Sequence, residues 1–336
     1  MQNELLAFHR QVNLTCFHNQ TEGHYESFFM RANHPNRPLA FWIRYTIFSP
    51  KNKPENNIGE LWATFFNGES NQHSVVKQEY PLANCLFDTT KFNIQIDKAK
   101  LTTHFMQGAI EKKGNKIAWK MSFDGGSLPL LLLPLNLYKG KFPAAKSLVS
   151  LPLAHFNGVL SVNDEKINIT DWVGSQNHNW GLKHTDLYSW GQVAGFDSDP
   201  DSFLEVATAK LKMGPFWTPP ITLLVLRHNQ KEYALTKLLQ GIKAHGKFRY
   251  FTWEFKSKTK DVEIEGEISA PGNAFIGLNY YNPPGGSKYC LNSKIAQCKL
   301  HFKDKTTGKI EMLETRHRAA FEILTNDQNH GITISA

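Results

Sequence analysis

The stretch KIAWKMSF, at residues 116–123, alternates apolar and polar side chains, and Ala118 is its small exception. The same period of two recurs in FNIQID at residues 92–97, in VEIEGEI at residues 262–268 and in CKLHF at residues 298–302. Successive side chains of a β-strand point to opposite faces, so each stretch predicts a strand with one buried face and one wet face. Frequent turn signals between such strands are typical of a barrel or a sandwich, and we expect an all-β fold.

Helical periodicity is rare in this chain. Residues 1–12 and residues 233–244 predict one short helix each. Between residues 128 and 153 the alternation stops and four prolines occur, and proline cannot donate to a sheet ladder. The length of 336 residues suggests about two domains. We therefore expect two tandem β domains, residues 1–140 and residues 141–336, joined through this proline-rich stretch.

Composition narrows the class of protein. The net charge is +8, but basic and acidic side chains are mixed along the chain, so no nucleic-acid surface is expected. The 4 cysteines form no C-x-x-C pair, which disfavours a cysteine zinc site and suits a reducing compartment. We expect no secretion signal, and the most apolar stretch, residues 128–137, is too short to cross a bilayer. We expect a cytoplasmic protein; peripheral membrane contact and the oligomeric state stay open.

Residues 171–196, DWVGSQNHNWGLKHTDLYSWGQVAGF, form the most unusual segment. The Gly-, Ser- and Asn-rich residues 174–181 predict a loop or a bulge. The strand predicted after them has one face of large side chains, namely Tyr188, Trp190, Gln192 and Phe196. Its other face holds only small side chains. This pattern indicates close packing on the small side, while the large side chains face a core or a cavity.

Three interpretations of this segment stay open. In the first, its His and Asn side chains only tie down a polar corner, and the tryptophans belong to the core. In the second, the segment forms the rim of a cavity, where His178 or Asp171 acts as an acid or a base. In the third, His178, His184 and Asp186 bind a metal ion, although their spacings match no common metal motif.

Two further strands are predicted at residues 24–30 and residues 41–48. Glu26 in the first and Arg44 in the second each lie among large apolar neighbours, and Trp42 shares the face of Arg44. A buried charge needs a partner, so we expect a Glu26–Arg44 ion pair inside the barrel. Such a pair is either purely structural or part of a ligand site.

Several segments together resemble one family. They are YESFFMRA at residues 25–32, FWIRYTIF at residues 41–48, GSQNHNWG at residues 174–181 and YSWGQVAGF at residues 188–196, with the proline-rich stretch in the middle. In this combination the chain, from about Tyr25 to Phe302, is similar to the hydroxyneurosporene synthase (carotenoid 1,2-hydratase) and AttH-like proteins. The resemblance implies an all-β fold of two tandem lipocalin-like (calycin) β-barrel domains.

The resemblance also covers the histidine segment. In those relatives an aspartate or asparagine, a histidine and then Trp-Gly precede an aromatic strand. The matching residues here are Asn177, His178, Trp180 and Gly181. Asn177 stands where relatives would carry Asp directly before His, and this removes one candidate proton donor.

The resemblance implies hydration of a terminal isoprenoid double bond or, as in related fungal proteins, guidance of a polyene cyclisation. Our leading hypothesis is an enzyme, a hydratase or a cyclase, that protonates a hydrophobic isoprenoid or polyene in a barrel or interdomain cavity. His178 and Asp171 are the candidate acids, because a Glu26 paired with Arg44 would stay ionised. Aromatic faces would stabilise the resulting cation. The candidate substrate-binding residues are Trp180, Tyr188, Trp190, Gln192, His184, Asp186, Glu26, Trp42 and Arg44.

Two alternatives remain open. Lipocalin-like barrels readily hold one small ligand, so the chain could be a carrier or sensor of a hydrophobic molecule without turnover. A structural protein with a filled barrel would have neither a ligand nor a cavity. Under each hypothesis we expect no cofactor and no bound metal ion.

Overall fold

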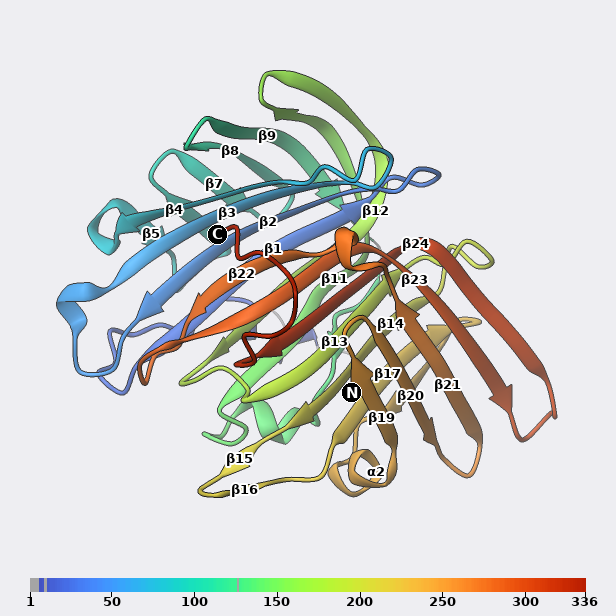
Figure 1. Cartoon of the computed structure of the whole chain (residues 1–336). Coiled ribbons are helices and arrows are strands. Elements are labelled where there is room, and N and C mark those ends of the chain that lie inside the picture. The colour runs from blue at the N-terminus through green and yellow to red at the C-terminus, as the bar shows by residue number, and fades with distance from the viewer. Residues whose placement is uncertain (1–5, 9–10, 126) are drawn as a thin grey trace.

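Two large antiparallel sheets make up almost the whole molecule (Figure 1). The computed structural model describes residues 6–8, 11–125 and 127–336. The helix expected at residues 1–12 therefore lies in part outside the described residues. Within the described part, no helix is long and apolar enough to cross a membrane.

The first sheet has 12 strands, and β10 lies beside its main path, paired with β11. The order across the main path is β4-β3-β2-β1-β12-β11-β9-β8-β7-β6-β5. The sheet curls until β4 contacts β8 and β9, which nearly closes a barrel. The strands are β1 (His24–Asn33), β2 (Leu39–Ser49), β3 (Ile58–Asn67), β4 (Ser74–Pro81), β5 (Cys85–Phe87), β6 (Asn93–Ile96), β7 (Ala99–Thr102), β8 (Phe105–Lys112), β9 (Asn115–Asp124), β10 (Leu130–Leu131), β11 (Ala145–Val162) and β12 (Glu165–Gly181).

The second sheet has 10 strands in the order β18-β17-β14-β13-β24-β23-β21-β20-β19, with β22 paired to β23. It curls as well, because β17 contacts β19 and β20. Its strands are β13 (Leu187–Ala194), β14 (Phe203–Lys210), β17 (Ile221–His228), β18 (Lys231–Leu235), β19 (His245–Arg249), β20 (Thr252–Lys258), β21 (Val262–Ser269), β22 (Ile276–Tyr281), β23 (Ser287–Asp304) and β24 (Ile310–Thr325). A separate hairpin pairs β15 (Lys212–Met213) with β16 (Phe216–Trp217).

Short helices lie in the connections between strands. They are η1 (Pro54–Asn56), η2 (Leu82–Asn84), η3 (Leu135–Tyr138), α2 (Leu238–Lys243) and η4 (Gly272–Ala274). The helix expected at residues 233–244 is thus shorter than predicted, because its first residues end β18 and only α2 is helical.

The predicted alternation is present in the strands that suggested it. In β9, Ile117, Trp119, Met121 and Phe123 are buried in the core of the first barrel. The apolar side chains of β21 enter a separate core inside the second sheet in the same way. The expectation of an all-β, lipocalin-like fold is therefore confirmed.

The two sheets divide the chain later than the expected boundary between residues 140 and 141. β11 pairs with β9 and β12, and β12 pairs with β1, so both strands belong to the first sheet. The division falls between Gly181 and Leu187. The prolines interrupt the sheet only locally, because β11 resumes the ladder and accommodates Pro152 at a register shift.

Residues 174–181 form the end of β12 rather than the predicted loop. The strand is paired on both sides, and its small residues permit a close approach of the neighbouring backbone. A Cβ atom on Gly174 would lie 1.8 Å from the carbonyl oxygen of Arg31. Pairing with β1 and β11 therefore overrides the local preference of Gly, Ser and Asn for turns.

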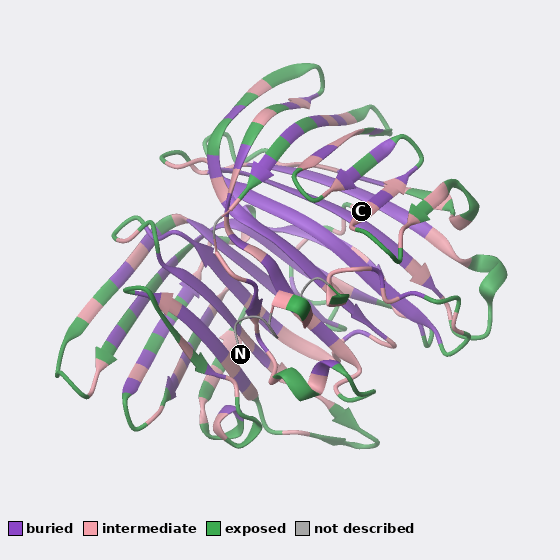
Figure 2. Ribbon diagram, turned by 180° about the vertical axis from the view of Figure 1, so that it is seen from behind, coloured by how far each residue is buried: buried purple, intermediate pink, exposed green. Residues whose placement is uncertain are grey.

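Burial is concentrated where the two sheets meet, as the purple strands in the centre of Figure 2 show. An apolar cluster crosses this junction. Phe29, Trp42 and Trp62 come from the first sheet, and Tyr280 and Leu324 come from the second. The junction thus has a core of its own, between those of the two barrels.

Candidate functional site

A cavity of about 210 Å³ lies in the junction between the two sheets. A dry protein cavity of about 150 Å³ is large enough for a benzene ring, so this one has room for a small apolar ligand. Aromatic side chains from both sheets form much of its wall, and the proline-rich stretch covers one side. The lining includes Tyr25, Phe29, Trp42, Arg44, Leu132, Phe142, Lys146, His184, Tyr188, Trp190, Leu223, Leu238, Tyr280 and Glu322.

The mouth of the cavity is apolar and open to solvent. Phe142 and Leu238 line the cavity although their side chains are 59% and 46% exposed. Leu211, another lining residue, directly precedes the β15–β16 hairpin, where Phe216 is 74% exposed. Exposed apolar side chains are therefore present at the opening of the cavity and in the hairpin that follows Leu211.

The period of two along β1 and β2 decides which side chains reach the cavity. Phe29 is paired with Arg44, and both point toward the second sheet. Glu26 is paired with Ile47, and both point into the first barrel. The expected Glu26–Arg44 ion pair is therefore wrong, because its two members lie on opposite faces of the same sheet.

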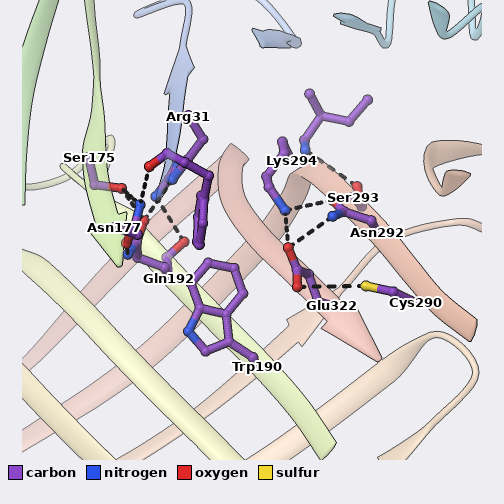
Figure 3. Close-up of polar contacts among 12 residues, drawn as sticks. Arg31, Ser175, Asn177, Trp190, Gln192, Cys290, Asn292, Ser293, Lys294 and Glu322 are labelled. Atoms are coloured by element: carbon purple, nitrogen blue, oxygen red, sulfur yellow. Dashed lines mark hydrogen bonds and ion pairs between the residues drawn. The ribbon is translucent and has the colours of Figure 1, made fainter. Parts of the chain in front are cut away.

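Glu322 of β24 provides the carboxylate of the cavity wall (Figure 3). Its Oε1 accepts hydrogen bonds from Lys294 Nζ at 2.7 Å and from Asn292 Nδ2 at 2.9 Å. Burial lowers the pKa of Lys294, and the charge of Glu322 opposes that shift. The lysine and the amide together fix the orientation of the Glu322 carboxyl group.

Two tyrosines stand beside this carboxylate. Tyr188 Oη lies 3.5 Å from Glu322 Oε2. Burial raises the pKa of Tyr188 and of Tyr280 well above the usual value, and the charge of Glu322 raises both further. Both hydroxyls stay protonated at neutral pH; Tyr188 donates to Glu322, and Tyr280 can donate a hydrogen bond to a ligand.

Arg44 brings a positive charge to the wall. Its side chain is only 6% exposed, and its guanidinium carbon lies 4.4 Å from the centre of the Tyr280 ring. Its Nε has no hydrogen-bond partner among the described residues. A buried guanidinium normally has several such partners, and because Arg44 lines the cavity, a ligand there can supply them.

His184 also lines the cavity, where it stacks on Tyr25 with ring centres 3.9 Å apart. Burial lowers the pKa of His184 to about 3, and the charges of Arg44 and Lys288 add to the effect. The imidazole is therefore neutral at physiological pH and is a poor proton donor.

A buried polar network joins the sheets next to the cavity, and Gln192 is at its centre (Figure 3). Gln192 Oε1 accepts from Arg31 Nε at 2.8 Å and from Ser175 Oγ at 2.6 Å. Gln192 Nε2 donates to Asn177 Oδ1 and to Glu205 Oε2, each at 2.8 Å. Protein groups therefore occupy Gln192, which does not line the cavity as expected.

Glu205 couples this network to the cavity wall. Its Oε1 accepts a hydrogen bond from Trp190 Nε1 at 2.7 Å, and Trp190 lines the cavity. Burial raises the pKa of Glu205 to about 7, although the hydrogen bonds from Trp190 and Gln192 oppose the shift. The charge beside Trp190 therefore changes near neutral pH.

Glu26 and His178 form a separate cluster inside the first barrel. His178 Nε2 lies 2.7 Å from Glu26 Oε1, and His24 Nε2 lies 3.0 Å from Glu26 Oε2. Because a carboxylate only accepts, each histidine donates from Nε2. The His178 ring is stacked between Phe28 and Trp180, with ring centres 4.2 and 4.5 Å away.

The hydrogen bonds determine the charge of Glu26. Burial would raise the pKa of Glu26, but the hydrogen bonds from His178 and His24 outweigh it and lower the pKa to about 2. Glu26 is thus ionised, and it points away from the cavity, as do His178 and Trp180. The candidate acid His178 would have to act on the opposite face of the sheet from the cavity.

The metal hypothesis fails for the residues that suggested it. His184 lines the cavity, whereas His178 is inside the barrel and Asp186 binds Lys183 at 3.2 Å. The grouping with metal-ligand geometry that the described residues do contain is Cys16, Glu26 and His178, whose ligand atoms lie within 4.8 Å of one another. Each carboxylate oxygen of Glu26 already accepts two hydrogen bonds from protein groups there.

Asp171 is not part of any buried site. Its side chain is 65% exposed and lies 2.6 Å from His155 Nδ1, and Asp171 does not line the cavity. An acid for alkene protonation needs surroundings that exclude water, so Asp171 does not fit the role expected for it. Of the other candidate residues, Trp42, Arg44, His184, Tyr188 and Trp190 do line the cavity.

Sequence reasoning missed Glu322, Lys294 and Tyr280. A signal was present for the first of them, because Glu322 is the lone charge in AAFEILT at residues 319–325. Lys294 lies in the stretch that follows Pro283-Pro284-Gly285-Gly286, where turn residues obscured the start of β23.

Several solved structures share this fold. No protein-family model matches the sequence, and no curated protein is similar to it in sequence. An AttH-like protein from Nitrosomonas europaea superposes with a TM-score of 0.56 at 12% identity, over 92% of this chain and 94% of that chain. Kievitone hydratase from Nectria haematococca superposes with a TM-score of 0.57 at 11% identity, over 92% of this chain and 93% of that chain. CghA with Sch210972 superposes with a TM-score of 0.51 at 10% identity, over 90% of this chain and 88% of that chain. The fold is thus the one implied by the AttH-like resemblance, and nothing in these matches is specific to hydroxyneurosporene synthase.

Proposed function

We propose that this chain is an enzyme that hydrates or cyclises a hydrophobic, unsaturated substrate in the cavity between its two sheets. The observation that carries the proposal is one carboxylate, Glu322, set in a mainly apolar and aromatic wall. Binding alone requires only the apolar surfaces. An oriented ionisable group that faces the same cavity adds the means for proton transfer.

Glu322 is suited to act as a general base. In a hydration it would take a proton from water while the water oxygen bonds to one carbon of a conjugated double bond. The electron pair of that bond moves toward the conjugated carbonyl oxygen, to which Tyr280 can donate a hydrogen bond. The proton then returns from Glu322 to the second carbon, so that one water is added and nothing is oxidised.

This mechanism differs from the alkene protonation expected from the sequence. A carbocation in the cavity would be repelled by Arg44, whereas an anionic intermediate would be stabilised by it. His178 and Glu26 lie on the opposite face of β1 and β12. Base-assisted addition of water therefore fits the cavity better than protonation of an isolated alkene.

The structural neighbours favour hydration as the first activity to test. Kievitone hydratase shares the fold and is by its name a hydratase. Cyclisation stays within the proposal, because an apolar cavity can also hold a polyene folded with its reacting carbons together.

The test begins with organic extraction of the purified protein and mass spectrometry of any bound molecule. The protein is then incubated in ¹⁸O-labelled water with that molecule and with a panel of conjugated terpenoid and phenylpropanoid carbonyl compounds. We expect a product that has gained one labelled water, or an isomer of equal mass for a cyclisation. Glu322→Gln should reduce turnover at least about a hundredfold and leave binding within about threefold.

Glu254→Gln, which alters an exposed carboxylate of the same sheet, is the matched control and should keep full activity. Full turnover in Glu322→Gln would exclude Glu322 as the base. Binding of the panel without turnover in the wild type would instead indicate a carrier or sensor.

A further inference from the structure

We infer that the substrate carries a carboxylate group, which Arg44 binds at the wall of the cavity. The inference rests on the proposed function and adds the chemical class of the ligand. The wall of the cavity contains a buried positive charge, Arg44, which binding of a purely apolar ligand would not require.

Arg44 is more than nine-tenths buried and faces the cavity. It lies over three aromatic rings, with the guanidinium carbon 4.4 Å from the Tyr280 centre and 5.9 Å from both the Trp42 and the Trp62 centres. Rings attract a cation but accept no strong hydrogen bond. The Nε of Arg44 has no hydrogen-bond partner among the described residues, and Arg44 lines the cavity, so a planar carboxylate in the cavity can approach the guanidinium group.

The other buried charges near Arg44 are already matched. Lys294 is paired with Glu322 at 2.7 Å, and Lys77 is paired with Glu60 at 2.6 Å. Burial would lower the pKa of Arg44, but Tyr280 and the carboxylates of Glu60 and Glu322 raise it. Those two carboxylates are each bonded to a lysine, so neither is a dedicated counter-ion of Arg44. Leaving a charge unpaired in a low-dielectric site is costly, so a bound anion would relieve the imbalance.

The lining contains one further cation, Lys146, near the proline-rich stretch. Its Nζ donates to the carbonyl oxygen of Pro143 at 2.8 Å, and burial lowers its pKa. A diphosphate would bring several negative charges to a wall that also contains the carboxylate of Glu322. A single carboxylate has the one negative charge that would balance the guanidinium of Arg44, so we assign the ligand to the monocarboxylates.

This assignment also orients the substrate. With its carboxylate on Arg44, the apolar part of the ligand would lie along the rings of Trp42, Tyr188 and Trp190. Its double bond would then lie near Glu322, which shares the cavity with Arg44. An unsaturated acid is therefore held by one end and reacts at a position along its chain.

The experiment compares ligands that differ only in the head group: geranic acid, geraniol and geranyl diphosphate. Binding to the full chain is followed by quenching of tryptophan fluorescence, since Trp42 and Trp190 line the cavity. We expect geranic acid to bind about tenfold tighter than geraniol, because a hydrogen bond to a charged group is strong in a buried site. Arg44→Gln should remove this preference, and Arg44→Lys should keep part of it.

Arg37→Gln, at an exposed arginine paired with Glu69, is the matched control and should keep the preference. If Arg44→Gln does not fold, the pH dependence of the wild type replaces it. Affinity for geranic acid should then fall as its carboxylate is protonated below about pH 5, and affinity for geraniol should not change.

Equal affinity for the acid and the alcohol, or tighter binding of the diphosphate than of the acid, would overturn the carboxylate assignment. Either result leaves the cavity as a hydrophobic binding site and so leaves the proposed function standing. Failure of all three ligands to bind the wild type would count against both.

Discussion

Replacement of Glu26 by Gln tests the buried cluster of the first barrel. The hydrogen bonds from His178 and His24 lower the pKa of Glu26 from its ordinary value of 4.5 to about 2, against the effect of burial. The carboxylate is thus bound more favourably in the folded chain than in the unfolded one. At ~1.4 kcal/mol for each tenfold change in the ionisation constant, this preference contributes about 3 kcal/mol at neutral pH.

The sign and the pH window follow from the lowered pKa. Because the folded pKa is depressed, the contribution is complete above the unfolded pKa of 4.5 and is lost as the pH falls through about 2. Glu26→Gln should therefore lower the free energy of unfolding by about 3 kcal/mol at pH 7 and by only about 1 kcal/mol at pH 3. The amide also cannot accept all four hydrogen bonds of the carboxylate, so the loss at pH 7 is a lower bound.

Urea denaturation at several pH values, followed by tryptophan fluorescence and by circular dichroism, measures this difference. Glu111→Gln, at an exposed carboxylate of β8, is the control and should match the wild type throughout. A loss below about 1 kcal/mol at pH 7, or a loss that stays constant down to pH 3, would refute the reasoning.

Three further outcomes are expected. Burial raises the pKa of Glu205 to about 7, so the free energy of unfolding should fall as the pH rises from about 5 to about 8. The fluorescence of Trp190 should change with a midpoint near pH 7, and a titration that persists in Glu205→Gln would contradict the assignment. Gly174→Ala, whose Cβ would lie 1.8 Å from a backbone oxygen of β1, should cost about 3 kcal/mol or more in urea denaturation, and Gly140→Ala, where the nearest atoms are 3.9 Å away, should cost little. Phe216→Ser, at a side chain of β16 that is 74% exposed, should weaken co-flotation with anionic lipid vesicles several-fold. A wild type that does not float would argue against peripheral membrane contact.

The sequence predicted the class of fold because alternation is a local property. The buried face of a run such as residues 116–123 can be identified from that run alone, whichever strands it pairs with. The division of the chain between sheets is a different matter, because it depends on which strands pair. The prolines of residues 128–153 suggested a boundary, yet β11 and β12 return to the first sheet and the division falls after Gly181.

The site was predictable only in part, for the same reason. Trp42, Arg44, Tyr188 and Trp190 were identified as unusual side chains on strand faces, and they do line the cavity. The predicted ion pair of Arg44 with Glu26 is wrong, because the register between the strands decides which side chains share a face. A difference of one residue between two neighbouring strands separates a buried pair into two environments.

The position of the cavity between the sheets has a consequence for how such proteins diversify. The separation of the two sheets sets the size of the cavity, and buried contacts such as Arg31–Gln192 hold that separation. Substitutions at these contacts can rescale the cavity while both barrels keep their own cores. This cavity could therefore fit a ligand of different shape without a change to either barrel core, and solved structures at 10% to 12% identity share the fold.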